Sequence, residues 1–337
     1  MTKLLIVGLG PAGLGALMAL AEAEREGFLI EGRDYELEVL EGQAKVGQKL
    51  LLTGGGRCNL THEGTLQDFV RHYFEGGKFL YPSLQALSPE MLREKLRCQG
   101  LETYAEKGRV FPVTNQAKDV LEALLSFVSP VLDGNLQLQS KVTALERTKD
   151  ERWLLRLQTG ETLTADHLLL ATGGASVPQT GSDGTMHEIL KTLGVPMTTL
   201  KPALVALLSP HSLKDLSGLS FPARFQLKPD QRRSKRENKV HAGEGTILIT
   251  EDGFSGPELL NRSRTLNGAG GTLELELFPD LSPKPYRQAK HKEGLRTLLH
   301  AQYPDIPDRL IKRLLQFVQA EHMRAPFDPT ELQSKLD

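Results

Sequence analysis

Hydrophobic residues near the N-terminus follow three patterns in succession. Residues 4–7 form a short continuous apolar run, which is typical of a strand buried on both faces. Residues 11–25 are rich in alanine and leucine and indicate a helix, and residues 35–40 alternate between apolar and polar side chains, which indicates a second strand. A strand, a helix and a strand in this order predict a βαβ unit.

Further strands are expected downstream of a helical region over residues 65–130. The segment 141–165 alternates as short strands around a turn at residues 158–161, and residues 167–171 are expected to form a buried strand. That strand stops abruptly at Thr172-Gly173-Gly174. The two glycines have no side chains, so a ligand can approach the backbone there.

The pattern changes near residue 196. Residues 196–280 alternate, with frequent turn residues, and predict an inserted small β-domain. Residues 281–337 carry apolar side chains at helical spacing, punctuated by proline, and predict a small helical module. We therefore expect an α/β protein with a Rossmann-like domain over residues 1–195 followed by these two parts.

Composition narrows the class of protein. With 337 residues, of which 39% are hydrophobic and 25% charged, the chain can bury the cores of two domains. Its formal net charge of -1 gives no overall attraction to nucleic acid or to an anionic membrane. Two cysteines, Cys58 and Cys98, form no disulfide framework, and the first apolar run is too short for a signal peptide. We expect a cytoplasmic protein without a membrane partner.

The turn between the first strand and the first helix carries the motif Gly8-x-Gly10-x-x-Gly13. Gly8 permits a tight turn, Gly10 lets a pyrophosphate approach the backbone, and Gly13 lets the helix pack closely on the strand. Pro11 and Ala12 open the helix, whose free N–H groups and dipole face the phosphates. The motif at this position predicts a dinucleotide site.

Such a site needs an acidic residue after the second strand to bind the ribose hydroxyls. Glu31 and Glu41 are the two candidates. Glu41 lies further from Gly13 than the usual spacing of about 20 residues, but Glu31 would leave almost no strand before it. We choose Glu41 as the ribose ligand and interpret Glu31 as a charge in a solvated loop.

Residues 51–62 read LLTGGGRCNLTH and contain three consecutive glycines. Each glycine costs extra backbone entropy on folding, so we expect something to come close to this backbone. The segment 47–61 resembles the Gly-x-Lys-x-x-x-Ser-Gly-Gly-Gly-Arg-Cys-Asn motif of BaiN-type, or aminoacetone-oxidase-like, bacterial flavoproteins, which bind FAD in a two-dinucleotide-binding-type fold. Segments similar to others of that family follow in the same order, at residues 171–184, 201–207, 216–220 and 243–260.

This resemblance implies that the Rossmann-like domain binds FAD. The three glycines would bring the chain against the flavin and the pyrophosphate, and Lys49, Arg57 and Asn59 would be the polar groups near the cofactor. A cation suits both a pyrophosphate and a flavin that becomes anionic when reduced. The cofactor-binding residues that we expect are Gly8, Gly10, Pro11, Ala12, Gly13, Glu41, Lys49, Gly54, Gly55, Gly56, Arg57, Cys58, Asn59, Val142, Thr172, Gly173 and Gly174.

The chain departs from the family pattern in three features. Thr53 stands where the family usually has serine, which keeps the hydroxyl, and His62 stands where it usually has asparagine. Chains of the family also return after the insertions with a strand and a Gly-Gly turn that closes over the flavin. We expect no such segment here, and therefore expect FAD to be held weakly.

Other redox and metal chemistry has little support. Cys58 lies forty residues from Cys98, so we expect it to pack beside the cofactor and not to form a redox dithiol. The nine histidines form no ligand pattern, and no metal is expected. A second Gly-x-Gly-x-x-Gly motif is also missing from the sequence, so any NAD(P)H would bind transiently over the flavin.

A strongly basic run occupies residues 228–239, with six cations and two anions. We interpret it as a solvated loop between two strands; attraction of an anionic substrate or of RNA phosphates is the alternative. No aromatic residue interrupts the run, which argues against a nucleic-acid partner.

The expected function is that of an FAD-dependent oxidoreductase, which transfers a hydride between the flavin and a small-molecule substrate. NAD(P)H and dioxygen are candidate redox partners. The alternative is a non-catalytic nucleotide-binding or RNA-associated protein that has kept the fold. The sequence identifies neither the substrate nor the catalytic residues, because proteins of one fold need not share a reaction.

Overall fold

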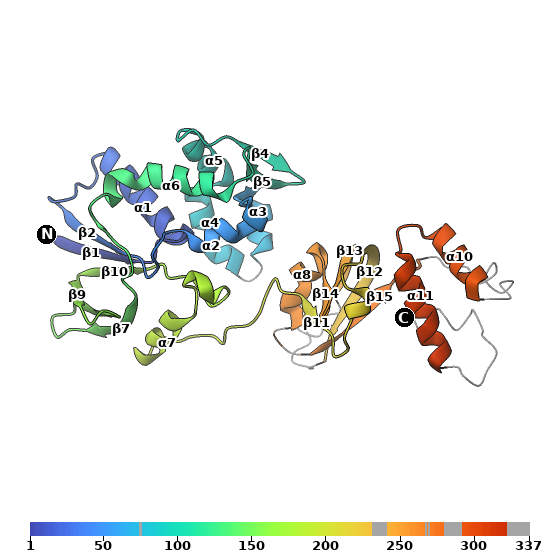
Figure 1. Cartoon of the computed structure of the whole chain (residues 1–337). Coiled ribbons are helices and arrows are strands. Elements are labelled where there is room, and N and C mark those ends of the chain that lie inside the picture. Colours follow the sequence, from blue (N-terminus) through green and yellow to red (C-terminus); the bar gives the residue numbers. More distant parts are fainter. Residues whose placement is uncertain (74–75, 231–240, 267, 269, 280–291, 322–337) are drawn as a thin grey trace. The chain divides into compact units, whose positions relative to one another are not determined.

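The computed structural model describes residues 1–73, 76–230, 241–266, 268, 270–279 and 292–321. The chain folds into two compact units, Met1–Thr198 and Thr199–Asp337 (Figure 1). Each unit has its own sheets and its own hydrophobic cores.

A parallel sheet forms the centre of the first unit. From edge to edge its strands are β10 (His167–Leu170), β1 (Thr2–Val7), β2 (Tyr35–Leu40) and β6 (Leu136–Gln137), and every neighbouring pair is parallel. The register pairs Val7 with Leu40 on one side and with Leu170 on the other. These three strands therefore end at the same level, and the loops that follow them all leave from the carboxyl end of the sheet.

Helices cover one face of this sheet. Helix α1 (Pro11–Arg25) and helix α6 (Ala117–Leu132) lie side by side over β1 and β2 (Figure 1). Ile6 and Val39, from the two strands, share a fully buried core with residues of both helices. Burial on this face is one half of the reason why residues 4–7 of β1 are all apolar.

A second, antiparallel sheet covers the opposite face. It contains β7 (Val142–Arg147), β8 (Trp153–Leu157) and β9 (Thr162–Ala165), and helix α7 (Thr185–Thr192) packs beside it. Leu5, Val7 and Leu40 point into this second core. The parallel sheet is thus enclosed on both faces. Ligands can enter at the carboxyl ends of its strands.

The predicted helical region over residues 65–130 is interrupted by a hairpin, so that prediction was wrong in part. Helices occupy most of it: α3 (Leu66–His72), α4 (Gly77–Ala86), α5 (Pro89–Arg97) and nearly all of α6. Strands β4 (Thr103–Glu106) and β5 (Arg109–Pro112) lie between α5 and α6 and pair with each other, and β5 also pairs with the short β3 (Thr61–His62). The hairpin turns at Lys107-Gly108, with φ values of 51° and 77°, whereas Asn-Gly or Asp-Gly would have signalled such a turn.

Strand β10 forms where it was expected but is less buried than predicted. His167 and Leu169 are exposed. Leu169 pairs with Ile6, so it lies on the helix-covered face of the sheet. The helices that cover β1 and β2 on that face leave the side chains of β10 open to solvent.

The second unit is built on an antiparallel sheet. Its strands, in spatial order, are β11 (Leu207–Leu208), β14 (Gly253–Ser255), β13 (His241–Thr250), β12 (Ser220–Pro229) and β15 (Gly271–Glu276). Side chains of β12 alternate strictly between exposed and buried over its first eight residues, as its sequence pattern predicts.

Helices of the second unit share one core with this sheet. Helix α8 (Pro257–Ser263) packs on β13, and α10 (Lys292–Gln302) packs on α11 (Asp308–Glu321). Leu299 and Ile311 belong to the same buried cluster as residues of β12 and β13. The strands and helices of this unit therefore stabilise each other.

The close Gly8–Gly13 contact can be tested by substitution. A Cβ at position 13 would lie 2.1 Å from the carbonyl oxygen of Gly8, so α1 would have to move away from the turn. We expect Gly13→Ala to lower the free energy of unfolding by about 1–3 kcal/mol, as overpacking does. Urea denaturation of the cofactor-free protein measures the change.

Gly15, on the same helix, provides the matched control. Outside the neighbouring backbone of α1, no atom in the described part of the chain lies within 4 Å of the position that its Cβ would take. Gly15→Ala should leave stability unchanged or raise it by up to about 1 kcal/mol, because alanine favours the helix. Equal effects of the two substitutions would contradict the close contact.

Candidate functional site

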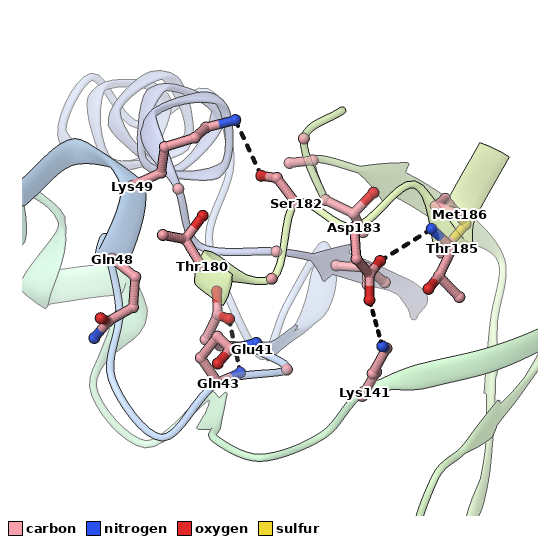
Figure 2. Close-up of a pocket in the computed structure, with 18 of the residues that line it drawn as sticks. Glu41, Gln43, Gln48, Lys49, Lys141, Thr180, Ser182, Asp183, Thr185 and Met186 are labelled. Carbon is pink, nitrogen blue, oxygen red and sulfur yellow. Dashed lines mark hydrogen bonds and ion pairs between the residues drawn. The ribbon is translucent and has the colours of Figure 1, made fainter. Parts of the chain in front are cut away.

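A pocket of about 320 Å³ opens where β1, β2 and β10 end. Its walls come from the loops after these strands, from the start of β7 and from residues 180–186 (Figure 2). The volume is within the range of small-ligand sites. The sequence-predicted residues that line it are Gly8, Gly10, Pro11, Ala12, Glu41, Lys49, Val142, Thr172, Gly173 and Gly174.

The glycine-rich turn after β1 leaves room for a ligand at one position and none at two others. At Gly8, whose φ is 98°, a Cβ would lie 2.6 Å from the carbonyl oxygen of Ala171, and Gly13 packs on Gly8 itself. At Gly10 the space that a Cβ would fill is open, and Gly10 caps α1 without any side-chain hydrogen bond. The unpaired amides of the first turn of α1 therefore face open space, which fits a pyrophosphate.

Glu41 lies in the pocket and holds two of its loops together. Its Oε2 accepts a hydrogen bond from the Leu9 amide at 2.8 Å, and its Oε1 accepts one from the Gln43 amide at 2.9 Å. A carboxylate can accept about four hydrogen bonds, so positions remain for ribose hydroxyls. Figure 2 shows Glu41 beside Gln43 at the pocket wall.

Glu31 lies elsewhere. It precedes β2, at the end of the strand opposite to the pocket, and its carboxylate accepts hydrogen bonds from the Asn135 side chain at 2.9 and 3.1 Å. Of the two acidic candidates in the sequence, the fold brings Glu41 to the pocket.

The turn after β10 forms the floor of the pocket. Gly173 has a φ of 77°, and a Cβ there would lie 2.6 Å from the hydroxyl of Ser182. The Gly174 carbonyl accepts a hydrogen bond from the Gly184 amide at 3.2 Å. Backbone of the Thr-Gly-Gly turn is thus packed against residues 182–184, as well as against the first glycine turn.

Lys49 brings a positive charge to this floor. It lies on α2 (Gln48–Leu52), and its Nζ donates a hydrogen bond to Ser182 Oγ at 3.0 Å (Figure 2). Ser182 is buried, so the ammonium group is held at a fixed place in the pocket. An anionic group of a ligand would gain from this charge.

The backbone conformation of the three-glycine turn gives a reason for glycine that is separate from the approach of a ligand. Gly54, Gly55 and Gly56 have φ values of 58°, 67° and 90°, so three consecutive residues adopt the left-handed conformation. Apart from the adjacent residues, no atom of the described residues lies within 4 Å of a Cβ at Gly55 or Gly56. Glycine is required here by backbone conformation before any ligand is considered.

Seven predicted residues do not line the pocket. Arg57 instead donates hydrogen bonds to Tyr104 at 2.7 Å and Glu106 at 2.9 Å, both on β4 of the hairpin, and to Asn115, which follows β5, at 2.8 Å. Its guanidinium lies 4.1 Å from the centre of the Phe111 ring. The residues outside the pocket wall are Gly13, Gly54, Gly55, Gly56, Arg57, Cys58 and Asn59.

Cys58 and Asn59 follow the three-glycine turn. Cys58 is buried and Asn59 is half-buried. Burial raises the pKa of the Cys58 thiol, so the thiolate that redox chemistry requires is disfavoured. The Oδ1 atom of Asn59 is buried and accepts no hydrogen bond from the described residues. An unpaired acceptor of this kind is open to a donor from a ligand.

Sequence reasoning missed the last wall of the pocket. Residues 180–186 lie across it, and Lys141 and Asp183 form an ion pair of 2.7 Å there (Figure 2). The signal was the Asp183-Gly184 pair just before α7, at the end of the family-like segment 171–184.

Two kinds of feature are missing from the described part of the chain. No group of three or more histidine, cysteine, aspartate or glutamate side chains in the described ranges could hold a metal ion. None of the helices that the structure describes is both long and apolar enough to cross a membrane.

Known proteins resemble this chain over most of its length. Residues 2–277 match the family model described as HI0933-like protein Rossmann domain. The 3-dehydro-bile acid delta(4,6)-reductase of Clostridium scindens is 27% identical, over 98% of this chain and 78% of that protein. The ribosomal RNA dihydrouridine synthase of Escherichia coli K12 is 25% identical, over 94% of this chain and 74% of that protein.

Solved structures share part of the chain. The quinol fumarate reductase FrdA of E. coli matches 52% of this chain and 33% of its own, with 15% identity and a TM-score of 0.37. Cyclohexanone monooxygenase from Rhodococcus sp. Phi1 matches 51% and 26%, with 16% identity and a TM-score of 0.32. At these TM-scores the likeness adds nothing to the family match.

The family match agrees with what residues 47–61 implied. It confirms the flavoprotein resemblance, the Rossmann-like α/β fold class and FAD as the cofactor. The open phosphate turn at Gly10 and the pocket around it suit that cofactor. The chain belongs to the HI0933-like family of Rossmann-domain proteins and is an FAD-dependent oxidoreductase.

Proposed function

We propose that FAD lies along the pocket with its adenosine half at Glu41 and its pyrophosphate at the N-terminus of α1. The observation that carries this orientation is the pair of open features, the unfilled space at Gly10 and the Glu41 carboxylate in the pocket. Val142 lies next to Lys141 on the same wall and would contact the adenine. When bound, FAD supplies two-electron hydride chemistry.

The flavin half would lie toward Lys49 and the Thr172–Gly174 turn. Lys49 is held by Ser182 and would provide the cation that favours an anionic reduced flavin. The three-glycine turn and the unpaired Asn59 oxygen would form the far end of this half of the site. Arg57 would act indirectly, because its hydrogen bonds fix that turn to the β4–β5 hairpin.

We further propose that the reaction is the reduction of a carbon–carbon double bond conjugated to a carbonyl group. The names of the relatives support this class: one reduces the double bonds of a 3-dehydro-bile acid, and the other forms dihydrouridine. A conjugated steroid ketone and a uracil ring both accept a hydride at the carbon remote from the carbonyl. NAD(P)H would supply the hydride by binding transiently, as the sequence suggests.

A small molecule is the favoured substrate. Lys228, the one cation of the basic run that lies on β12, is not free for phosphates, because it pairs with Glu274 on β15. Arg224, earlier on β12, lies 3.5 Å from Glu244 and 3.6 Å from Glu276. Residues 231–239 of the run lie outside the described residues. RNA is therefore kept as an alternative substrate for experiment.

Reduction of the purified holoprotein tests the proposed reaction. NADH or NADPH should bleach the bound flavin without dioxygen, and a conjugated steroid dienone should then restore its colour. We expect reoxidation about tenfold or more faster than without an acceptor, which corresponds to about 1.4 kcal/mol of barrier.

Ribosomal RNA, added in place of the dienone, tests the alternative substrate. If RNA reoxidises the flavin quickly and the dienone does not, the substrate is RNA and not a small molecule. Failure of both acceptors would contradict this reaction class, and a colourless protein that FAD does not stabilise would favour the non-catalytic alternative.

Glu41→Ala tests the placement of the ribose. A hydrogen bond to a charged group is worth about 1.5–3 kcal/mol, so the dissociation constant of FAD should rise about tenfold or more. Glu31→Ala is the matched control, because that carboxylate lies at the other end of β2. Unchanged affinity in the Glu41 variant, or a defect in the Glu31 variant instead, would overturn the assignment.

Gly55→Ala tests whether the three-glycine turn approaches FAD. A left-handed alanine costs about 1–2 kcal/mol, and no protein atom would clash with its methyl group. The protein should therefore stay folded, as circular dichroism can verify, while the FAD that co-purifies is lost. If the variant keeps a full complement of FAD, the turn serves only the fold of the chain.

A further inference from the structure

Residues 178–184 form a segment that closes one wall of the pocket. The segment begins with the 3-10 turn Pro178–Thr180 and leads into α7. Gly181 and Gly184, near its end, have φ values of 89° and 82°, so the segment bends sharply around Ser182 and Asp183. It lines the same pocket as the loops of β1, β2 and β10.

This segment is fastened at several points to the rest of the pocket. Ser182 accepts the hydrogen bond from Lys49, and the Gly184 amide donates to Gly174. Gly181 packs on Gln43, since a Cβ at Gly181 would lie 2.8 Å from the Gln43 side-chain nitrogen. The remaining fastening, the Lys141–Asp183 ion pair, joins the segment to the wall formed by the start of β7.

Both oxygens of Asp183 have a partner. Oδ2 accepts a hydrogen bond from Lys141 Nζ at 2.7 Å, and Oδ1 accepts one from the Thr185 amide at 3.0 Å, in the first turn of α7. The hydrogen bond from Lys141 holds the pKa of the Asp183 carboxyl well below its usual range. Asp183 therefore stays charged at neutral pH, and its direction is fixed.

The ion pair lies at the Glu41 end of the pocket. Lys141 packs against Gly42, the residue after Glu41: its Cγ would lie 3.7 Å from a Cβ at that position. The neighbouring Ser140 amide donates to the Glu41 carbonyl at 2.9 Å. Figure 2 shows the Lys141 ammonium and the Asp183 carboxylate joined across from Glu41 and Gln43.

We propose that the Lys141–Asp183 pair is a latch that retains the adenosine half of FAD by holding residues 178–184 against the β7 wall. This inference rests on the orientation of FAD proposed above and not on the proposed reaction. Two facing walls of the pocket can separate at this end only if the pair breaks. The pair should therefore slow the release of FAD without taking part in the chemistry.

Salt should weaken such a latch. The side chains of Lys141 and Asp183 are 38% and 30% exposed, so solvent ions reach the pair in part. Loss of either charge should have the same effect as loss of both, because one interaction is removed in each case. These two properties separate a latch from a general loss of packing.

The test is the rate at which oxidised holoprotein releases FAD after dilution, followed by the gain of flavin fluorescence. No electron donor or substrate is present, so failure of the proposed reaction would not affect the result. Lys141→Met, Asp183→Asn and the double variant should each release FAD about threefold to tenfold faster at low salt. Added salt should speed release from the wild type and leave the variants nearly unchanged.

Matched controls keep the test independent of folding. Lys191→Met removes a comparable ion pair of α7, Lys191 with Glu188 at 2.7 Å, and should not change the release rate. Asparagine at position 183 can still accept the hydrogen bond from Thr185. If Asp183→Asn fails to fold, Lys141→Met alone carries the test. The Lys141 side chain does not cap a helix, so its loss should leave the fold intact.

Fragments of the cofactor locate the effect. The variants should bind ADP more weakly than the wild type does, by a similar factor, and should bind FMN equally well. Unchanged release rates in both single variants would overturn the latch. Weaker binding of FMN with unchanged binding of ADP would also overturn it, because the pair would then serve the flavin half.

Discussion

The parallel register of β1 with its two neighbours is the constraint on which the rest of the site depends. Val7 pairs with both Leu40 and Leu170, so three strands that are far apart in sequence end at one level. Helices enclose the sheet on one face and a second sheet encloses it on the other, so the loops meet at the carboxyl ends of the strands. A slip of one residue in this register would turn the side chains of β1 toward the wrong cores and separate the glycine turns.

Contact between bare backbones then gives the site its shape. Gly8 lies against Ala171, Gly13 lies against Gly8, and Gly173 lies against Ser182, at distances that leave no room for a Cβ. The first of these contacts joins separate loops of the pocket, and the last joins the turn after β10 to the Ser182 side chain in the same connection between β10 and α7. At Gly10, in contrast, a Cβ would meet open space, which is what a phosphate requires.

The charged side chains that line this surface have hydrogen-bond partners within the protein. Glu41 ties the first two loops through backbone amides, Lys49 is held by Ser182, and Lys141 is held by Asp183. Fixed partners keep these groups in place, so a dinucleotide meets a preorganised set of donors and acceptors. Arg57 has the same kind of role for the three-glycine turn, which it links to the β4–β5 hairpin.

The sequence by itself determined the elements whose signals are local. The apolar run of β1, the glycine motif before α1 and the alternation of β2 and β12 predicted those elements, and the Gly-Gly-Gly-Arg-Cys-Asn segment identified the flavoprotein family. Glu41 was preferred to Glu31 because the length of a strand can be inferred from its pattern. The Lys107-Gly108 hairpin was missed for a local reason, because its turn lacks the Asn-Gly or Asp-Gly signal. Tertiary structure decided what depends on distant partners: the exposure of Leu169, the direction of Arg57 and the pairing of Lys141 with Asp183. These features could not be predicted, because each is set by which remote segment the register of the sheet brings alongside, and no local pattern of residues records that choice.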